Sequence, residues 1–491
     1  MSAATAPVRR AYPLLVGDSE VAITDRRMPA VAPGSGEQVA EVPLAGAEVV
    51  DAAVDAAAAA APGWAALGAA ERGRHLRRLA DAVRADAERL AVIDALDSGN
   101  PLAAMRNDLS YGADALDYFA GIARELHGKT LPASPGGLHL TLREPYGVVA
   151  RILPFNHPLM FTLFHAAAPL AAGNTVIVKA PDQTPISPLE VAYLAAEVLP
   201  PGVLTVLTGD GPTTGEALVA HPGIGRIGFT GRGPTGLRVM EAAAASGRVK
   251  HVTVELGGKN PLLVGADADP AYVAEQAVRG MNFESSQGQS CGSTSRLYVP
   301  DRMHDAVVEA LAERLGRITV GDPLEGSTTM GPLVSAAQLE RVAGYVASGR
   351  AEGARLVCGG SRPDGVHPGG FYLEPTLFDT VDPAHTIAVE EIFGPVLSVL
   401  RWRDRDELIA GANATRYGLT ANIITGDLDW AVDTARRVEA GCVWINGRGQ
   451  HFLETPFGGY KDSGLGAEGS MDSLLTYTRT KVVHILDIGA H

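Results

Sequence analysis

The chain has 491 residues, of which 46% are hydrophobic and 20% charged, a composition typical of ordinary globular proteins. This length exceeds what a single hydrophobic core organises, so we expect two or three domains. A net charge of −15 and a pI of about 5.3 argue against nucleic acid or an anionic membrane as the main partner and leave small molecules open.

Nothing in the sequence indicates secretion, a membrane span or a metal site. Residues 1–15 lack a continuous apolar core, and the alanine-rich run 52–70 is interrupted by charged, proline and glycine residues. The three cysteines, Cys291, Cys358 and Cys442, are an odd number at wide spacing, which fits neither a disulfide framework nor a zinc pattern. We therefore expect a cytoplasmic protein without a metal ion.

The N-terminal third is predicted to be mainly helical. Residues 1–45 are punctuated by proline and glycine and predict extended, turn-rich chain. Two helical patterns follow, divided at Pro62-Gly63, and the second spans Ala70–Leu96. A further helix is predicted over Pro101–Leu126.

After this region the chain alternates strands with helices. In Leu138–Arg143, leucine alternates with polar residues, which predicts a half-exposed hairpin or arm. Continuous apolar runs then predict strands at Val148–Leu153, Thr175–Lys179, Val203–Leu207, Arg226–Thr230 and His251–Leu256. Helix-length segments between them, such as Pro188–Val198 and Pro234–Ala245, argue for a parallel sheet covered on both faces, as in a nucleotide-binding domain.

The same alternation restarts after Gly258 and predicts a second α/β domain. Its strands are expected at Pro261–Val264, Arg296–Val299, Val396–Arg401, Ala421–Thr425 and Val443–Asn446. Its helices are expected at Pro270–Met281, Met303–Leu315, Ala336–Ser348, Asp406–Ala414 and Leu428–Val438. Leu474–Ile488 predicts a strand near the C-terminus. The fold class is therefore α/β with two doubly wound domains.

Two local motifs suggest chemistry. Gly231–Gly236 is a G-x-G-x-x-G turn between a strand and a helix, which suits phosphate binding, although a plain strand-to-helix turn fits equally well. Cys291 lies among small and amide residues in 287–293, whereas the apolar or glycine-flanked surroundings of Cys358 and Cys442 predict inert packing residues. On composition alone a nucleophilic and a buried structural role for Cys291 are equally compatible.

Seven segments, in order along nearly the whole chain, resemble the NAD(P)-dependent aldehyde dehydrogenase superfamily. They are Pro154–Pro158 (PFNHP), Lys179–Pro185 (KAPDQTP), Gly228–Gly231 (GFTG), Glu255–Lys259 (ELGGK), Gly288–Cys291 (GQSC), Glu390–Pro395 (EEIFGP) and Pro456–Lys461 (PFGGYK).

The resemblance implies roles for three catalytic residues. Cys291 would attack the aldehyde carbonyl to form a thiohemiacetal, and the Asn156 amide with the backbone N–H of Cys291 would stabilise the oxyanion. Hydride transfer to the nicotinamide would leave a thioester. Glu255 would activate the water that hydrolyses this thioester. This role takes precedence over the alternative in which Glu255 holds the cofactor's ribose.

The resemblance also implies a cofactor site. Lys179 and Asp182 would hydrogen-bond the adenosine ribose, and Glu391 the nicotinamide ribose, with Phe393 packed nearby. The other residues expected at the cofactor are Thr230, Gly231, Arg232, Gly236 and Leu256. The Asp182 carboxylate would repel a 2′-phosphate, which favours NAD, while Arg232 would offset part of that repulsion and leaves NADP possible.

The substrate side is less specific. The residues expected near the tunnel mouth are His157, Phe161, Phe164, Ser290, Gly292, His451 and Phe452. Two histidines beside aromatic side chains suggest a polar or aromatic aldehyde with an acceptor group, and solvent-facing loop histidines are an equally good interpretation. Two residues depart from the family. His165 stands where many relatives have a lysine near the base, so the proton route would differ from the usual one. Arg232 stands where the family usually has a serine against the pyrophosphate.

The resemblance further implies a domain division. The NAD-binding domain would comprise 1–126 and 146–257, and the catalytic domain 258–462. Residues 127–145 and 463–491 would form an oligomerisation arm and a C-terminal strand that join subunits into a homodimer or homotetramer.

The expected activity is NAD-dependent oxidation of a small-molecule aldehyde to a carboxylic acid. A CoA-acylating semialdehyde dehydrogenase is an alternative, but such enzymes typically lack the base that Glu255 would provide. Two further alternatives are a non-catalytic NAD-binding or redox-sensing protein on the same fold and a purely structural oligomer.

Overall fold

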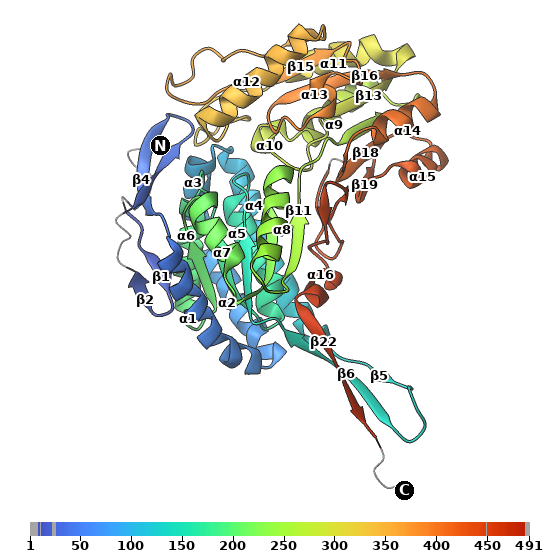
Figure 1. Cartoon of the computed structure of the whole chain (residues 1–491). Coiled ribbons are helices and arrows are strands. Elements are labelled where there is room, and N and C mark those ends of the chain that lie inside the picture. The colour runs from blue at the N-terminus through green and yellow to red at the C-terminus, as the bar shows by residue number, and fades with distance from the viewer. Residues whose placement is uncertain (1–7, 10, 22–25, 448, 487–491) are drawn as a thin grey trace.

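The computed structural model describes residues 8, 9, 11–21, 26–447 and 449–486. Two lobes each contain a mostly parallel sheet, and a narrow arm projects from the lower lobe (Figure 1). This arrangement confirms the prediction of an α/β fold with parallel-sheet domains. Within the described ranges, no helix is both long and apolar enough to cross a membrane.

The lower lobe contains a six-stranded sheet in the order β21-β11-β10-β7-β8-β9 (Figure 1). Its strands are β7 (Val148–Ile152), β8 (Thr175–Lys179), β9 (Leu204–Leu207), β10 (Ile224–Thr230), β11 (His251–Glu255) and β21 (Gly464–Leu465). All neighbours are parallel except β11 and β21. Every residue of β7 and β8 is buried, because helices cover both faces, so these strands show no polar alternation.

The helices of this lobe are α1 (Ala47–Ala66), α2 (Ala69–Ala85), α3 (Ala87–Ser98), α4 (Leu102–Ile122), α5 (Pro158–Ala171), α6 (Ile186–Val198), α7 (Glu216–Ala220) and α8 (Gly233–Ala245). Two predicted boundaries are wrong. Helix α1 continues through Pro62, which is exposed, so solvent can satisfy the carbonyl oxygen that proline leaves unpaired. The predicted helix Ala70–Leu96 is divided at Asp86, which leaves the helical region with φ −110° and ψ 19°.

Two hairpins account for the extended N-terminal chain. They are formed by β1 (Leu14–Val16) with β2 (Ser19–Val21), and by β3 (Arg27–Ala32) with β4 (Glu37–Pro43).

The upper lobe contains a seven-stranded sheet in the order β14-β15-β16-β13-β12-β18-β19. Its strands are β12 (Pro261–Val264), β13 (Arg296–Pro300), β14 (Arg355–Cys358), β15 (Thr376–Asp379), β16 (Val396–Trp402), β18 (Thr420–Ile424) and β19 (Cys442–Ile445). Its helices are α9 (Pro270–Gly280), α10 (Phe283–Ser286), α11 (His304–Leu315), α12 (Ala336–Ala351), α13 (Thr386–Val389), α14 (Arg405–Asn413) and α15 (Leu428–Arg437). The sequence analysis missed β14 and β15, which are short and flank a stretch rich in glycine and proline.

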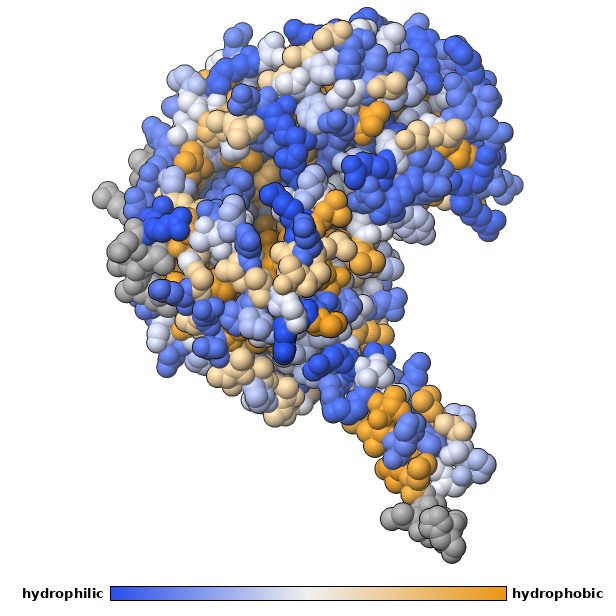
Figure 2. Space-filling model, in the orientation of Figure 1, coloured by the Kyte–Doolittle hydropathy of each residue, from blue (hydrophilic) through white to orange (hydrophobic). Residues whose placement is uncertain are grey.

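The arm is an antiparallel sheet of β5 (Thr130–Leu131), β6 (Leu138–Pro145) and β22 (Thr478–Ile485), with β6 in the centre. Leu138, Leu142, Val482 and Ile485 are between 43% and 54% exposed, and Figure 2 shows the arm as a concentrated apolar patch. The predicted C-terminal strand begins later than expected, because residues up to 476 belong to α16 (Met471–Thr476). Residues 487 and 488 of that prediction lie outside the described residues.

Candidate active site

Cys291 lies in a tight loop between α10 and β13. Gly288 opens this loop with a φ of 70°, and a Cβ there would come within 2.4 Å of the Gly394 carbonyl oxygen, so only glycine fits. The buried Asn260 amide donates to the carbonyl oxygens of Cys291 at 2.7 Å and Ser293 at 3.0 Å. The tight turn at Gly288 and the hydrogen bonds from Asn260 therefore hold the Cys291 loop in place.

Glu255 ends β11, and its side chain lies close enough to the Cys291 thiol for each to shift the pKa of the other. Burial raises the pKa of Glu255 to about 7, against the opposing effect of the Cys291 thiol. Burial, followed by the nearby Glu255 carboxylate, raises the pKa of the Cys291 thiol well above its ordinary value. Cys291 is therefore a thiol, and Glu255 is a base placed to take its proton.

Both residues open into a cavity of about 630 Å³. All the residues predicted near the substrate lie on its wall, namely His157, Phe161, Phe164, Ser290, Gly292, His451 and Phe452. One face of α5 provides much of this wall, because its residues recur at helical spacing. Cys442 also lines the cavity rather than packing inertly, and burial raises the pKa of its thiol to about 11.

Asn156 immediately precedes α5 and is 4% exposed. Its backbone carbonyl oxygen accepts from the Asn100 side-chain amide at 2.8 Å. Its own Oδ1 has no hydrogen-bond partner among the residues that the structure describes. The backbone is thus held while the side-chain amide oxygen is uncommitted.

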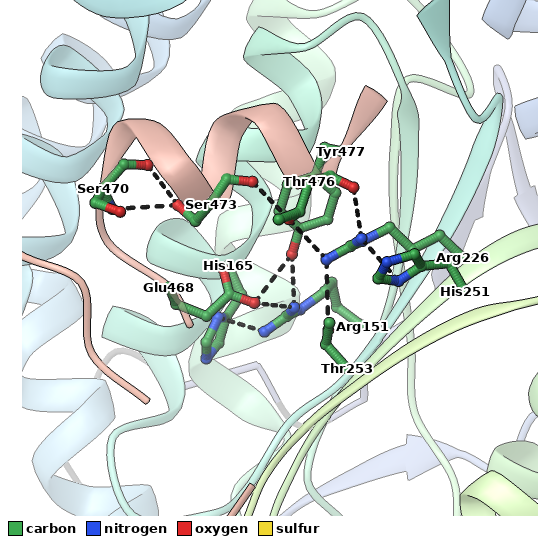
Figure 3. A network of polar contacts seen from close by, with 10 residues as sticks. All are labelled: Arg151, His165, Arg226, His251, Thr253, Glu468, Ser470, Ser473, Thr476 and Tyr477. Carbon is green, nitrogen blue, oxygen red and sulfur yellow. Dashed lines mark hydrogen bonds and ion pairs between the residues drawn. The ribbon is translucent and has the colours of Figure 1, made fainter. Parts of the chain in front are cut away.

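A network of buried polar side chains lies next to Glu255, with Arg151 at its centre (Figure 3). Arg151 donates through Nη1 to Glu468 Oε1 and to the Tyr477 hydroxyl, both at 2.7 Å, and through Nη2 to His165 Nδ1. Arginine has no acceptor, so His165 Nδ1 accepts and its proton lies on Nε2. Burial and the charge of Arg151 lower the pKa of His165 well below its ordinary value, so His165 is neutral beside the Arg151 cation.

The predicted cofactor residues gather at the carboxyl ends of β8, β10 and β11. Lys179 is buried and forms an ion pair with Asp182 at 3.7 Å. Gly231 donates from its backbone to the Glu255 carbonyl oxygen at 3.0 Å, and Thr230 Oγ1 is buried without a partner in the described part of the chain. The carboxyl edge of a parallel sheet, at the start of a helix, is where dinucleotides bind.

The rest of the predicted cofactor site also comes together. A Cβ on Gly236 would lie 2.5 Å from the Leu256 side chain, so glycine allows α8 to pack closely on the end of β11. Arg232 precedes the first turn of α8, where space is open around Gly233. Glu391 accepts from the Gly258 backbone at 3.1 Å, and the Phe393 ring packs edge-on against Phe155 at 5.6 Å.

Comparison with known proteins agrees with this geometry. The family model described as "Aldehyde dehydrogenase family" matches residues 21–483. The chain belongs to the aldehyde dehydrogenase family. It is 43% identical over 492 residues to aldehyde dehydrogenase tropH of Talaromyces stipitatus, covering 98% of this chain and 95% of that protein.

Solved aldehyde dehydrogenase structures are similar over the whole fold. A putative aldehyde dehydrogenase from Burkholderia cenocepacia superposes with a TM-score of 0.95 at 39% identity, covering 98% of this chain and 99% of that one. The NAD+ complex of an aldehyde dehydrogenase from Bacillus cereus gives 0.94 at 37% identity, covering 97% and 96%. The resemblance inferred from the seven segments is thereby confirmed.

Several residues of this aldehyde dehydrogenase site escaped the sequence analysis. Arg151 is the clearest example. A charged residue inside a continuous apolar strand needs a buried partner, and this requirement alone could have marked Arg151 as part of a polar network. Asp108, Tyr111 and Trp444 also line the cavity. They lie outside the recognised segments and carry no local indication of their position.

Proposed function

We propose that this protein oxidises an aldehyde to a carboxylic acid through covalent intermediates on Cys291, with NAD as the hydride acceptor. The observation that carries this proposal is that the Cys291 thiol and the Glu255 carboxyl group, of pKa about 7, lie together at the wall of a substrate-sized cavity. A base whose pKa is close to 7 is partly deprotonated at neutral pH, so it can accept a proton, and it still binds that proton strongly.

In the first step, the Cys291 sulfur forms a bond to the aldehyde carbon and Glu255 accepts the thiol proton. The carbonyl oxygen becomes an oxyanion, for which the Asn156 side-chain NH2 group and the Cys291 backbone N–H are the proposed donors. One such donor contributes about 3–4 kcal/mol to the lowering of the barrier.

The cofactor residues fit NAD. Lys179 and Asp182 would hold the adenosine ribose, the open first turn of α8 with Arg232 would take the pyrophosphate, and Glu391 would reach the nicotinamide ribose. The buried, unpartnered Thr230 hydroxyl at this edge supports the fit. NAD, when bound, supplies the acceptor for the hydride that leaves the carbon attached to Cys291. Asp182 favours NAD over NADP because its charge opposes a 2′-phosphate.

The last step is hydrolysis of the thioester. A water molecule gives its proton to Glu255 and adds to the thioester carbon; the carbon–sulfur bond then breaks, releasing the acid and regenerating Cys291. Glu255 serves twice, which requires that it lose its first proton between the two steps.

The arm supports a proposed homodimer or homotetramer. A protruding sheet that exposes Leu138, Leu142, Val482 and Ile485 together is the kind of apolar surface that marks a protein–protein interface, and its outer strands offer edges for pairing (Figures 1 and 2). The proposed division keeps 1–126 with 146–257, 258–462 as the catalytic domain, and 127–145 with 463–491 as the joining elements, although β21 lies within the six-stranded sheet. A mass measurement in dilute solution that finds only monomer contradicts this proposal.

The test is NADH formation over a panel of aliphatic, aromatic and carboxylated aldehydes. We expect turnover by the wild type and none by Cys291→Ala, since among the described residues Cys291 is the cavity thiol that lies beside the Glu255 carboxyl group. Cys442→Ala is the matched control, because its thiol lines the same cavity but has no neighbouring base. Activity retained by Cys291→Ala, or measurable NAD binding without turnover of any aldehyde, overturns the proposal.

A further inference from the structure

A histidine–aspartate pair on the cavity wall takes no part in the proposed chemistry. His157 precedes the first turn of α5, and its Nδ1 lies 2.6 Å from Asp108 Oδ2 of α4. Both side chains are largely buried, at 15% and 16% exposure, and both face the cavity that contains Cys291.

The pairing determines which hydrogen-bonding group His157 presents. A carboxylate only accepts, so Nδ1–H of His157 donates to Asp108 and Nε2 is the remaining ring nitrogen. Within the described chain Nε2 has no hydrogen-bond partner. Burial alone would lower the pKa of His157, but the charges of Asp108 and Asp94 outweigh it and raise the pKa above its ordinary value. The protonated ring then presents a second N–H donor, from a cation, to the cavity.

The other ionic groups on the cavity wall already have partners behind it. Arg279 is paired with Glu275 at 2.5 Å and Glu284 with Arg314 at 2.6 Å. Glu468 is paired with Arg151. Glu255 belongs to the chemistry at Cys291. Arg279 also lines the cavity, but it is 44% exposed and its Nε is bonded to Glu275; within the described wall His157 is the largely buried cationic donor that a ligand can reach.

The rest of the wall suits a flat skeleton. The aromatic side chains lining the cavity are Tyr111, Phe161, Phe164, Trp444, Phe452 and Phe457. Phe161 stands perpendicular to the His157 ring, with centroids 5.7 Å apart. Such a lining binds π-systems by stacked and edge-on contacts, while a few placed polar groups determine the orientation of the ligand.

We propose that the His157–Asp108 pair binds a negatively charged oxygen, a carboxylate or a phenolate, on an aromatic or conjugated aldehyde whose carbonyl reaches Cys291. This inference rests on the proposed function and specifies its substrate class. His157 supplies the donor, and Asp108 is a positioning residue that holds the ring and its charge.

The competing explanation is that the pair merely joins α4 to α5. Asp108→Asn separates the two explanations, because asparagine keeps an oxygen that accepts from Nδ1–H but removes the charge that keeps His157 protonated. A joining role predicts no change in substrate preference, whereas the proposal predicts a loss of preference at nearly constant melting temperature.

The experiment compares kcat/KM for 4-carboxybenzaldehyde and 4-hydroxybenzaldehyde with that for 4-methylbenzaldehyde, which has similar size and no charge. The wild type is expected to prefer one of the charged aldehydes, and which one identifies the oxygen as carboxylate or phenolate. His157→Phe is expected to lower that preference at least about tenfold, mainly through KM, as for the loss of a hydrogen bond from a charged donor. Asp108→Asn is expected to lower it less.

The matched control is His221→Phe, the same substitution at a histidine that also faces an aspartate, Asp51 at 3.3 Å, but lies outside the cavity. It should leave the preference within about twofold. An unchanged preference in His157→Phe, or a loss that appears in His451→Phe instead, overturns the inference while the aldehyde dehydrogenase activity stands.

A binding measurement keeps the inference testable without turnover. 4-Carbamoylbenzoate has an amide in place of the aldehyde, and 4-methylbenzamide lacks the charge. We expect calorimetry to give a lower Kd for the carboxylate in the wild type, and the difference to disappear in His157→Phe. Equal Kd values in the wild type contradict the inference. Absence of turnover on every aldehyde, with this Kd difference present, contradicts only the proposed function.

Discussion

Two groups of buried polar side chains line one small cavity of about 10 Å³, to which Glu255 contributes from one group and Arg151 and Glu468 from the other. In the Arg151 group the charges are paired, Arg151 with Glu468 and Tyr477, and Tyr477 with Glu468, although Arg151 Nε has no partner within the described residues. In the catalytic group, Glu255 Oε1 has no partner within the described residues.

The difference shows how one sheet edge serves two purposes. The paired group is stabilised by charge-assisted hydrogen bonds, which offset the loss of hydration. The unpaired group keeps part of its desolvation cost, which appears as the raised pKa values of Glu255 and Cys291. The cavity between them is about large enough for one water molecule, and its wall is polar enough to bind one.

The largest expected effect tests the catalytic side of the comparison. Glu255→Gln removes the base but keeps the shape, so the steady-state rate should fall about 10²–10⁴-fold. Because Glu255 accepts a proton in both proposed steps, the rate of the NADH burst, measured by stopped-flow absorbance, should fall together with the steady-state rate. A burst of unchanged rate followed by a slow steady state would restrict Glu255 to the hydrolysis step, and full activity would contradict its role as base.

The next effect tests the paired side. Arg151→Met leaves the Glu468 carboxylate without its cation in a largely buried site, so the free energy of unfolding should fall by about 3–5 kcal/mol. Arg106→Met is the control, because Arg106 pairs with Glu88 on the surface, where both are more than half exposed, and should cost less than about 1 kcal/mol. Equal losses in denaturant titrations of the two variants would contradict the ranking.

The pH dependence of stability sharpens the comparison. The pKa of Glu255 is raised from 4.5 in the free group to about 7, so its ionisation in the folded protein costs stability as the pH rises through that window. Glu255→Gln lacks this cost. Its stability relative to wild type should therefore increase between pH 4.5 and pH 7, by up to about 3 kcal/mol. A melting-temperature difference that is constant with pH would contradict the assignment.

The smallest effect concerns the hydroxyl of Tyr477. It accepts from Arg151 at 2.7 Å and donates to Glu468 at 3.2 Å, so Tyr477→Phe leaves both neighbours with one partner fewer. The ion pair itself remains, and the loss should be about 1–2 kcal/mol. Thermal denaturation of Tyr477→Phe beside Arg151→Met checks the order, and a larger loss for Tyr477→Phe would show that the hydroxyl, not the charge, organises the network.

Much of the fold was predictable from local pattern. The parallel strands at 175–179 and 261–264 were predicted at their observed bounds, because strands buried on both faces are continuous apolar runs. The division at Pro62 was wrong. Proline usually ends a helix because it leaves a carbonyl oxygen unpaired, but here the helix is exposed and solvent can satisfy that oxygen. The strands at 355–358 and 376–379 were missed because a short strand acquires its identity from the neighbour with which it pairs.

The candidate site divides in the same way. The order of its motifs indicated the family, and the candidates Cys291, Glu255 and Asn156 were found in short segments that carry their own glycines or prolines. Tertiary structure decided which charges are satisfied. Asp108 meets His157 across 49 residues, and Arg151 meets Glu468 across 317. Hydrogen bonds and desolvation depend on distance in space, so the pKa shifts, the tautomers of His157 and His165, and the free donor in the cavity are set only once the chain has folded.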